Sequence, residues 1–265
     1  MYRERISTLK SMAQSPAHYW HARNNPRPKT ASMTLGSLVH ALVLGGDYFL
    51  FDGDVRRGKA WDSCQAHAQE DWAAKRKPHE PEEPLIVKGS ELELAQNIAA
   101  SVLNDPLARP FLVGKPEHHI EFELDGRPFR STLDVLGADF VCDLKTTTNA
   151  SPDLFPHHAR RLRYDAQLAT YAEAAAHEMG LARSDDLPPP IRCCLVVVEV
   201  SAPFAVSVFQ YTPTAIMQAR KSVRLWNERA VQCEKENAWP GYCQSVIDLD
   251  AEQEIELEFA EDGLE

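Results

Sequence analysis

The pattern of hydrophobic and polar residues predicts an α/β protein built on a mixed sheet. Two β-rich runs flank a Gly-Ala-Asp turn at residues 137–139, as expected for a hairpin. Residues 191–200 are almost wholly apolar and β-branched, which is typical of a buried central strand. An Asp-Gly turn at 125–126 joins one further strand to the hairpin. The expected strands are residues 120–124, 129–135, 139–146, 191–200 and 204–211.

Other segments favour helices flanking this sheet. Residues 34–44 carry apolar side chains at the three- and four-residue spacing of one helical face. Tyr19 and Trp20 are expected to pack in the core. Residues 45–84 are poorly periodic and contain Gly and Pro clusters, which favour loops. The expected helices are residues 6–12, a segment opening at Pro16, 34–44, 90–104, one long helix at 157–179, and 214–236.

The length and composition of the chain bound its architecture. With 265 residues, of which 44% are hydrophobic, the chain can bury a full core. We expect one domain over residues 1–249, with a core at about 85–236, an N-terminal helical part at 1–84 and an acidic tail at 250–265. No apolar run is long enough to span a membrane and no signal-peptide pattern begins the chain, so we expect no membrane partner and a cytoplasmic location.

Two absences in the sequence narrow the chemistry. The six cysteines form no C-x-x-C pair, so a zinc site or a disulfide framework is not expected. We expect reduced thiols instead. The chain also has no G-x-x-x-x-G-K-[ST] phosphate loop, so no ATP-driven step is expected.

The net charge of -11 is unevenly distributed. Residues 250–265 hold eight acidic residues and no basic ones, which leaves 31 acidic and 28 basic residues in the rest. A nearly neutral body can still present a basic face to nucleic acid. Residues 254–259 alternate acidic and apolar side chains, so the tail is either a strand that docks on a neighbouring subunit or partner, or a disordered acidic solubiliser.

The candidate chemistry is concentrated in the hairpin. Asp143 and Lys145 share one face of the second strand, while Leu144 between them points into the core. If the two strands pair, Asp134 comes to the same edge. Two carboxylates that converge beside an ammonium are costly unless a divalent cation lies between them, and oxygen ligands favour Mg²⁺ or Mn²⁺. The alternative is a set of ordinary surface charges.

A second group of polar residues lies on the helix that follows. Gln167 and Tyr171 are four residues apart and share a face, with Tyr164 one turn earlier. Their side chains can hydrogen-bond phosphate or bases. The first half of this helix also carries three arginines, which either contact DNA or form a solvated surface: Arg160, Arg161 and Arg163.

These residues resemble the PD-(D/E)xK nuclease core in its RecB-like form, and more narrowly the RecE-type exonucleases (exodeoxyribonuclease VIII). The resemblance extends from about Ile6 to Trp239. Leu133 stands where the motif has its proline, which shapes the backbone and not the chemistry. The segments that carry the resemblance are Ser15-Pro16-Ala17-His18-Tyr19-Trp20, Leu35-Gly36-Ser37-Leu38-Val39-His40, the hairpin, Asp143-Leu144-Lys145-Thr146-Thr147 and Gln167-x-x-x-Tyr171.

The resemblance implies a restriction-endonuclease-like fold and a site with defined roles. It makes Lys145, Asp134 and Asp143 catalytic. It implies that His40 completes a metal site with Asp134, Asp143 and the Leu144 carbonyl, for Mg²⁺ with Mn²⁺ as a substitute. Glu117 matches a glutamate that precedes the first strand. Glu117, Gln167, Tyr171, Tyr164 and the three arginines become accessory or DNA-binding residues. The cysteine spacing argues against the iron–sulfur cluster of the Cas4-like relatives.

The activity implied is hydrolysis of one strand of linear double-stranded DNA from a 5′ end, without ATP, leaving a 3′ single-stranded overhang for phage-type recombination. Such enzymes act as closed homo-oligomeric rings, here a trimer or tetramer, beside a RecT/Bet-like single-strand annealing protein. Two alternatives remain open at this stage: a Cas4-like or restriction-type endonuclease, and a catalytically idle nuclease fold that binds DNA or a partner.

Overall fold

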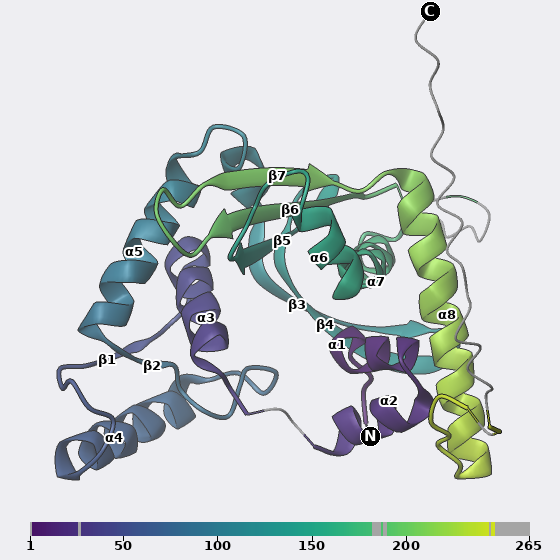
Figure 1. Cartoon of the computed structure of the whole chain (residues 1–265), viewed down its shortest axis with the longest axis horizontal. Coiled ribbons are helices and arrows are strands. Elements are labelled where there is room, and N and C mark those ends of the chain that lie inside the picture. Colours follow the sequence, from purple (N-terminus) through teal and green to yellow (C-terminus); the bar gives the residue numbers. More distant parts are fainter. Residues whose placement is uncertain (1, 26–27, 182–186, 188–189, 244, 247–265) are drawn as a thin grey trace, which may run out of the picture.

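A five-stranded mixed sheet organises the chain in the computed structural model, which describes residues 2–25, 28–181, 187, 190–243 and 245–246 (Figure 1). The strand order is β3-β4-β5-β6-β7, with β5 and β6 parallel and the other neighbours antiparallel. A separate two-stranded sheet pairs β1 (Phe49–Phe51) with β2 (Ile86–Lys88). The main strands are β3 (Lys115–Leu124), β4 (Arg127–Leu136), β5 (Phe140–Thr147), β6 (Arg192–Glu199) and β7 (Val206–Gln210).

Helices cover both faces of this sheet, as Figure 1 shows. Side chains alternate along β6, so Leu195 joins one apolar cluster and Val196 the other. The first cluster packs beneath α1 (Ile6–Leu9), α7 (Tyr164–Glu178) and α8 (Pro213–Glu236). The second lies beneath α3 (Ala31–Leu44) and α5 (Gly89–Asn104). The remaining helices are η1 (Lys10–Ala13), α2 (Pro16–Asn24), α4 (Lys59–Lys75), η2 (Arg109–Leu112) and α6 (Phe155–Arg161).

The α/β fold class and the five predicted strands are confirmed, whereas one helix prediction and one loop prediction are wrong. The helix expected at 157–179 is broken into α6 and α7, because Arg163 adopts a left-handed backbone conformation with φ of 54°. The Arg163 side chain stacks 4.5 Å from the Trp226 ring and pairs with Asp165 at 3.1 Å, contacts that local periodicity cannot reveal. Residues 45–84 contain the 17-residue helix α4, whose one buried residue is Ala68, so no apolar stripe marks it.

The strand predicted as buried and central, β6, lies inside the sheet between β5 and β7, as expected. One smaller expectation changes. Tyr19 is fully buried as expected, but Trp20 is 41% exposed and stacks on Trp239 at a ring separation of 4.6 Å. Trp20 therefore lies outside the core, although its ring partner Trp239 packs against the first apolar cluster.

β4 and β5 pair over only two positions, Val135 with Cys142 and Leu136 with Val141, and then part. The extended N-terminal segment lies along β4 beyond this point, because the Glu4 N–H donates to the Pro128 carbonyl at 2.8 Å. Where the two strands part, their facing backbone N–H and C=O groups no longer pair with each other. The candidate site forms at this point.

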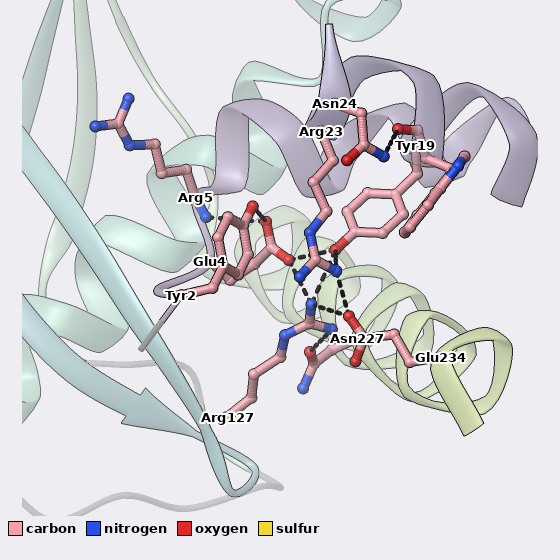
Figure 2. Close-up of polar contacts among 10 residues, drawn as sticks. Tyr2, Glu4, Arg5, Tyr19, Arg23, Asn24, Arg127, Asn227 and Glu234 are labelled. Atoms are coloured by element: carbon pink, nitrogen blue, oxygen red, sulfur yellow. Dashed lines mark hydrogen bonds and ion pairs between the residues drawn. The ribbon is translucent and has the colours of Figure 1, made fainter. Parts of the chain in front are cut away.

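The buried carboxylate of Glu4 ties this N-terminal segment to the rest of the fold (Figure 2). Glu4 pairs with Arg127 at 2.7 Å and accepts a hydrogen bond from the Tyr19 hydroxyl at 2.5 Å. Arg127 in turn pairs with Glu234 of α8 at 2.9 Å. Loss of one partner would leave a buried charge uncompensated, which typically costs about 3–5 kcal/mol.

Among the described residues, no helix combines the length and apolar character that a membrane span requires. The acidic tail predicted at 250–265 lies outside the described residues.

Candidate active site

Asp134 compensates for the backbone pairing that β4 and β5 lose where they part. Its Oδ2 accepts a hydrogen bond from the backbone N–H of Leu144 at 2.7 Å. A buried N–H without a partner is costly, so this bond stabilises the split and holds the carboxylate at its edge. Asp134 is 8% exposed. The side chain thus bridges the two strands of the predicted hairpin, at the edge where the sequence placed it.

Asp143 and Lys145 lie on the same face of β5, as predicted, and form a close ion pair. Leu144 between them is buried in the opposite apolar cluster. The other carboxylate oxygen of Asp143 accepts a hydrogen bond from Gln167 Nε2 at 2.7 Å. Gln167 Nε2 also donates to the Tyr171 hydroxyl at 3.0 Å. Gln167 therefore orients the Asp143 carboxylate, and Tyr171 in turn orients Gln167.

The electrostatics of this group follow from its burial. Burial raises the pKa of Asp143 to about 6; the Lys145 ammonium opposes the rise and the Asp134 carboxylate adds to it. For Lys145, burial lowers the pKa, but the Asp143 and Asp134 carboxylates outweigh burial, so the pKa of Lys145 is raised overall. With protein charges alone, Lys145 is protonated. Its single ammonium faces two carboxyl groups, those of Asp143 and Asp134.

His40 reaches the site from α3. Its Nε2 lies 2.8 Å from the Leu144 carbonyl oxygen, and its Nδ1 lies 3.6 Å from Asp134 Oδ2. The helix can approach β5 closely because Gly36, one turn before His40, has no side chain. A Cβ at that position would lie 3.3 Å from Thr146 Oγ1, a tighter contact than most Cβ atoms make.

The donor atoms of His40, Glu117 and Asp134 all lie within 4.8 Å of one another. Glu117 adopts a left-handed backbone conformation, with φ of 45°, an uncommon state for a residue other than glycine that often marks a functional site. Partial desolvation raises the pKa of Glu117, whose side chain is 47% exposed, and the nearby Asp134 carboxylate adds to the rise. One imidazole and two carboxylates that repel each other fit a hard divalent cation such as Mg²⁺ or Mn²⁺.

This cluster differs in part from the ligand set that the resemblance implied. His40 and Asp134 are in both. Glu117, expected as an accessory residue, lies in the cluster, whereas the oxygens of Asp143 contact Lys145 and Gln167. The Leu144 carbonyl faces the His40 ring. Asp143 remains close enough to raise the pKa of Glu117, so it forms part of the same acidic centre.

The other predicted residues divide into those that contact the site and those that are exposed or held by other partners. Tyr164 is near, because the Lys145 ammonium lies 5.1 Å from its ring centroid. Tyr171 is 8% exposed and lies against Gln167. Arg160 and Arg161 are exposed on α6, whereas Arg163 is held by Asp165 and Trp226.

Sequence reasoning did not single out two neighbours of the site. The Lys10 ammonium lies 5.7 Å from the Tyr164 ring centroid and donates to the Leu162 carbonyl at 3.0 Å. The Glu80 carboxylate contributes to raising the pKa of Glu117. Both residues are far from the hairpin along the chain, and neither lies in a pattern that would have distinguished it from a surface charge.

A mixed sheet whose parting strands carry Asp134 and Asp143-x-Lys145 defines a PD-(D/E)xK-type fold and site. The chain belongs to the family described as "PDDEXK-like domain of unknown function (DUF3799)", whose profile matches residues 5–250. A comparison with curated proteins gives no significant match.

Solved structures include similar folds. A candidate exonuclease from Eubacterium rectale superposes with a TM-score of 0.62 at 15% sequence identity, covering 94% of this chain and 90% of its own. A phage-related exonuclease from Haemophilus somnus 129PT matches with a TM-score of 0.36 at 11% identity, covering 89% and 97%. At 15% identity the first similarity shows the shared fold.

Proposed function

We propose that the protein is a metal-dependent deoxyribonuclease that hydrolyses phosphodiester bonds at the cluster formed by His40, Glu117 and Asp134. The observation that carries this proposal is the convergence of these three donors beside the Asp143–Lys145 pair. Membership of a PDDEXK-like family and the fold shared with a structure described as a candidate exonuclease support it.

A bound Mg²⁺ or Mn²⁺ ion would supply Lewis-acid activation of a phosphoryl oxygen and of water. His40, Glu117 and Asp134 would hold it, with Asp143 and the Leu144 carbonyl at its border. Together they supply oxygen and nitrogen donors of the type these ions prefer. The Gln167 amide keeps one Asp143 oxygen in place, and the Tyr171 hydroxyl keeps the amide in place.

Lys145 would stabilise the negative charge that develops on the phosphoryl group. Its raised pKa keeps the ammonium charged, which favours an orienting and charge-stabilising role over that of a general base. Tyr164 lies beneath this ammonium, with a separation of 5.1 Å that suits a cation–π contact. Such a contact limits the positions that the long lysine side chain samples.

The finer activity rests on the resemblance to RecE-type exonucleases. We propose degradation of one strand of linear double-stranded DNA from the 5′ end, without ATP, to leave a 3′ overhang. The same resemblance suggests a ring-shaped trimer or tetramer, a single-strand annealing partner and a role in phage-type recombination. Gln167 and the exposed Arg160 and Arg161 are the proposed DNA contacts. The buried Tyr171 is assigned to positioning Gln167, and the equally buried Tyr164 to supporting Lys145.

Digestion of matched linear and covalently closed plasmids with Mg²⁺ tests this function. An exonuclease consumes the linear form and leaves the closed circle intact. End-labelled duplexes then show the polarity, because a 5′ label is released first as a short product. Cleavage of the closed circle would indicate the endonuclease alternative, and binding without cleavage of either form would indicate an idle nuclease fold.

A further inference from the structure

Two arginines of the N-terminal segment project onto the outer face of the β3–β4 hairpin. The segment runs beside β4, where the Arg130 N–H donates to the Glu4 carbonyl at 2.9 Å. Successive side chains of an extended chain point to opposite faces. Since Glu4 is buried toward the core, Arg3 and Arg5 point to the other face, and Figure 2 shows the Arg5 guanidinium directed away from the Glu4 contacts.

Arg130 of β4 completes this group on the same outer face, and Arg3, Arg5 and Arg130 together are called the arginine strip. Arg3 pairs with Glu121 at 2.8 Å, and Glu121 is the cross-strand partner of Arg130. Within the described ranges, neither Arg5 nor Arg130 forms an ion pair with a carboxylate, and the buried Nε of Arg130 has no hydrogen-bond partner. Burial lowers the pKa of Arg5, and the neighbouring Arg130 cation lowers it further.

The arginine strip lies in line with the candidate active site. His119 and Thr132 form the adjacent cross-strand row, joined by a side-chain contact of 3.2 Å, and Glu117 and Asp134 lie two residues further along β3 and β4. Arg130 is four residues from Asp134, which is about 13 Å at roughly 3.3 Å per residue of strand. Each strand of duplex DNA rises about 3.4 Å per nucleotide along the helix axis, and its successive phosphates are further apart than this rise, so the separation spans no more than a few nucleotides.

We propose that the arginine strip binds the phosphodiester backbone of DNA within a few nucleotides of the reacting phosphate. Three arginines outnumber Glu121 and Glu123 on this face, so the strip has a net positive charge on a protein of net charge -11. Two neighbouring guanidinium groups repel each other until an anion lies between them, and their planar forks match phosphate oxygens. This inference rests on the proposed nuclease function and adds to it the path of the substrate backbone.

The test is the salt dependence of DNA binding, measured with Ca²⁺ in place of Mg²⁺. The variants are Arg5→Gln and the double variant Arg5→Gln/Arg130→Gln. Each lost phosphate contact should reduce the slope of log K against log salt by about 0.9 for duplex DNA, so the double variant should lose about 2. We expect a roughly tenfold or greater loss of affinity near 0.1 M salt, equal for different sequences.

Matched variants separate a phosphate contact from a structural effect. Arg229→Gln removes an exposed arginine of α8, on the other side of the sheet, and should leave the slope unchanged. Arg5→Lys/Arg130→Lys keeps both charges and should restore most of the slope. An unchanged slope and affinity in the double variant would overturn the proposal. So would equal losses in the glutamine and lysine doubles.

Hydrolysis of bis(p-nitrophenyl) phosphate with Mn²⁺ distinguishes the failure of this inference from failure of the proposed function. This small ester cannot reach the strip, so its rate should be the same in the wild type and the double variant. A parallel fall in ester hydrolysis and melting temperature would assign the arginines to folding and reject the proposal. If the wild type hydrolyses neither ester nor DNA, the nuclease function fails, while the salt slope still decides the arginine strip.

Discussion

Gln167 of α7 donates from Nε2 to Asp143 Oδ1 of β5 at 2.7 Å, and to the Tyr171 hydroxyl one turn later at 3.0 Å. An amide group carries two N–H donors, so it can make both bonds at once. Because α7 and β5 pack within one apolar core, the direction of the Asp143 carboxylate is set by the packing of the fold. This arrangement leaves the second oxygen of Asp143 to Lys145.

Lys145→Ala should lower the single-turnover rate of DNA cleavage by about 10²–10³-fold, because it removes a group that stabilises transition-state charge. Calorimetric titration should show Mn²⁺ and DNA binding within a few-fold of wild type, since the ammonium is not a ligand. Lys145→Arg retains the charge in a planar group and should recover the rate only in part. Near-normal cleavage by the alanine variant would remove Lys145 from the mechanism.

Asp134→Asn, Asp143→Ala and Glu117→Gln should each weaken or abolish metal binding, because each removes a carboxylate from the acidic centre. Metal that binds only the folded state raises the melting temperature. We therefore expect the wild type to melt higher as Mn²⁺ increases, and the variants to show little such shift and no metal-dependent turnover. Unaltered Mn²⁺ titrations in all three would place the metal elsewhere. An unaltered Mn²⁺ titration in Glu117→Gln alone would show that Glu117 is not a metal ligand.

His40→Ala should weaken Mn²⁺ binding at least several-fold while the protein stays folded. The imidazole is half-buried and contacts the Leu144 carbonyl and Asp134, so its removal costs about one hydrogen bond, or roughly 1 kcal/mol of stability. Thermal melting and metal titration measure the two effects separately. A variant that melts several degrees lower yet cleaves at the wild-type rate would show that His40 only packs against β5.

Gln167→Ala and Tyr171→Phe form a graded pair. The first leaves a buried carboxylate without its amide donor, which costs about 1–3 kcal/mol, and the second removes only the hydroxyl that accepts from that amide. Cleavage should therefore fall about tenfold or more in Gln167→Ala and only a few-fold in Tyr171→Phe. Equal losses, or a larger loss in Tyr171→Phe, would contradict a chain of positioning that runs from Tyr171 through Gln167 to Asp143.

Local periodicity predicted the secondary structure well where burial is regular. The strand at 191–200 is almost wholly apolar, because both faces of β6 contact helices. The same reasoning missed α4, whose residues are mostly exposed, and joined α6 to α7 across Arg163. At Arg163 the decisive contact is made by a partner distant in sequence, the Trp226 ring.

The sequence by itself determined the α/β class, the hairpin, and the placement of Asp143 and Lys145 on one side of β5, because strand alternation is a local property. Only the tertiary structure decided that β4 and β5 part beyond Val135 and that Asp134 bonds the free N–H of Leu144. It likewise placed Glu117 beside His40, although 77 positions separate the two residues in the sequence. Distances of this kind depend on how sheets twist and helices pack, which no local pattern of residues encodes.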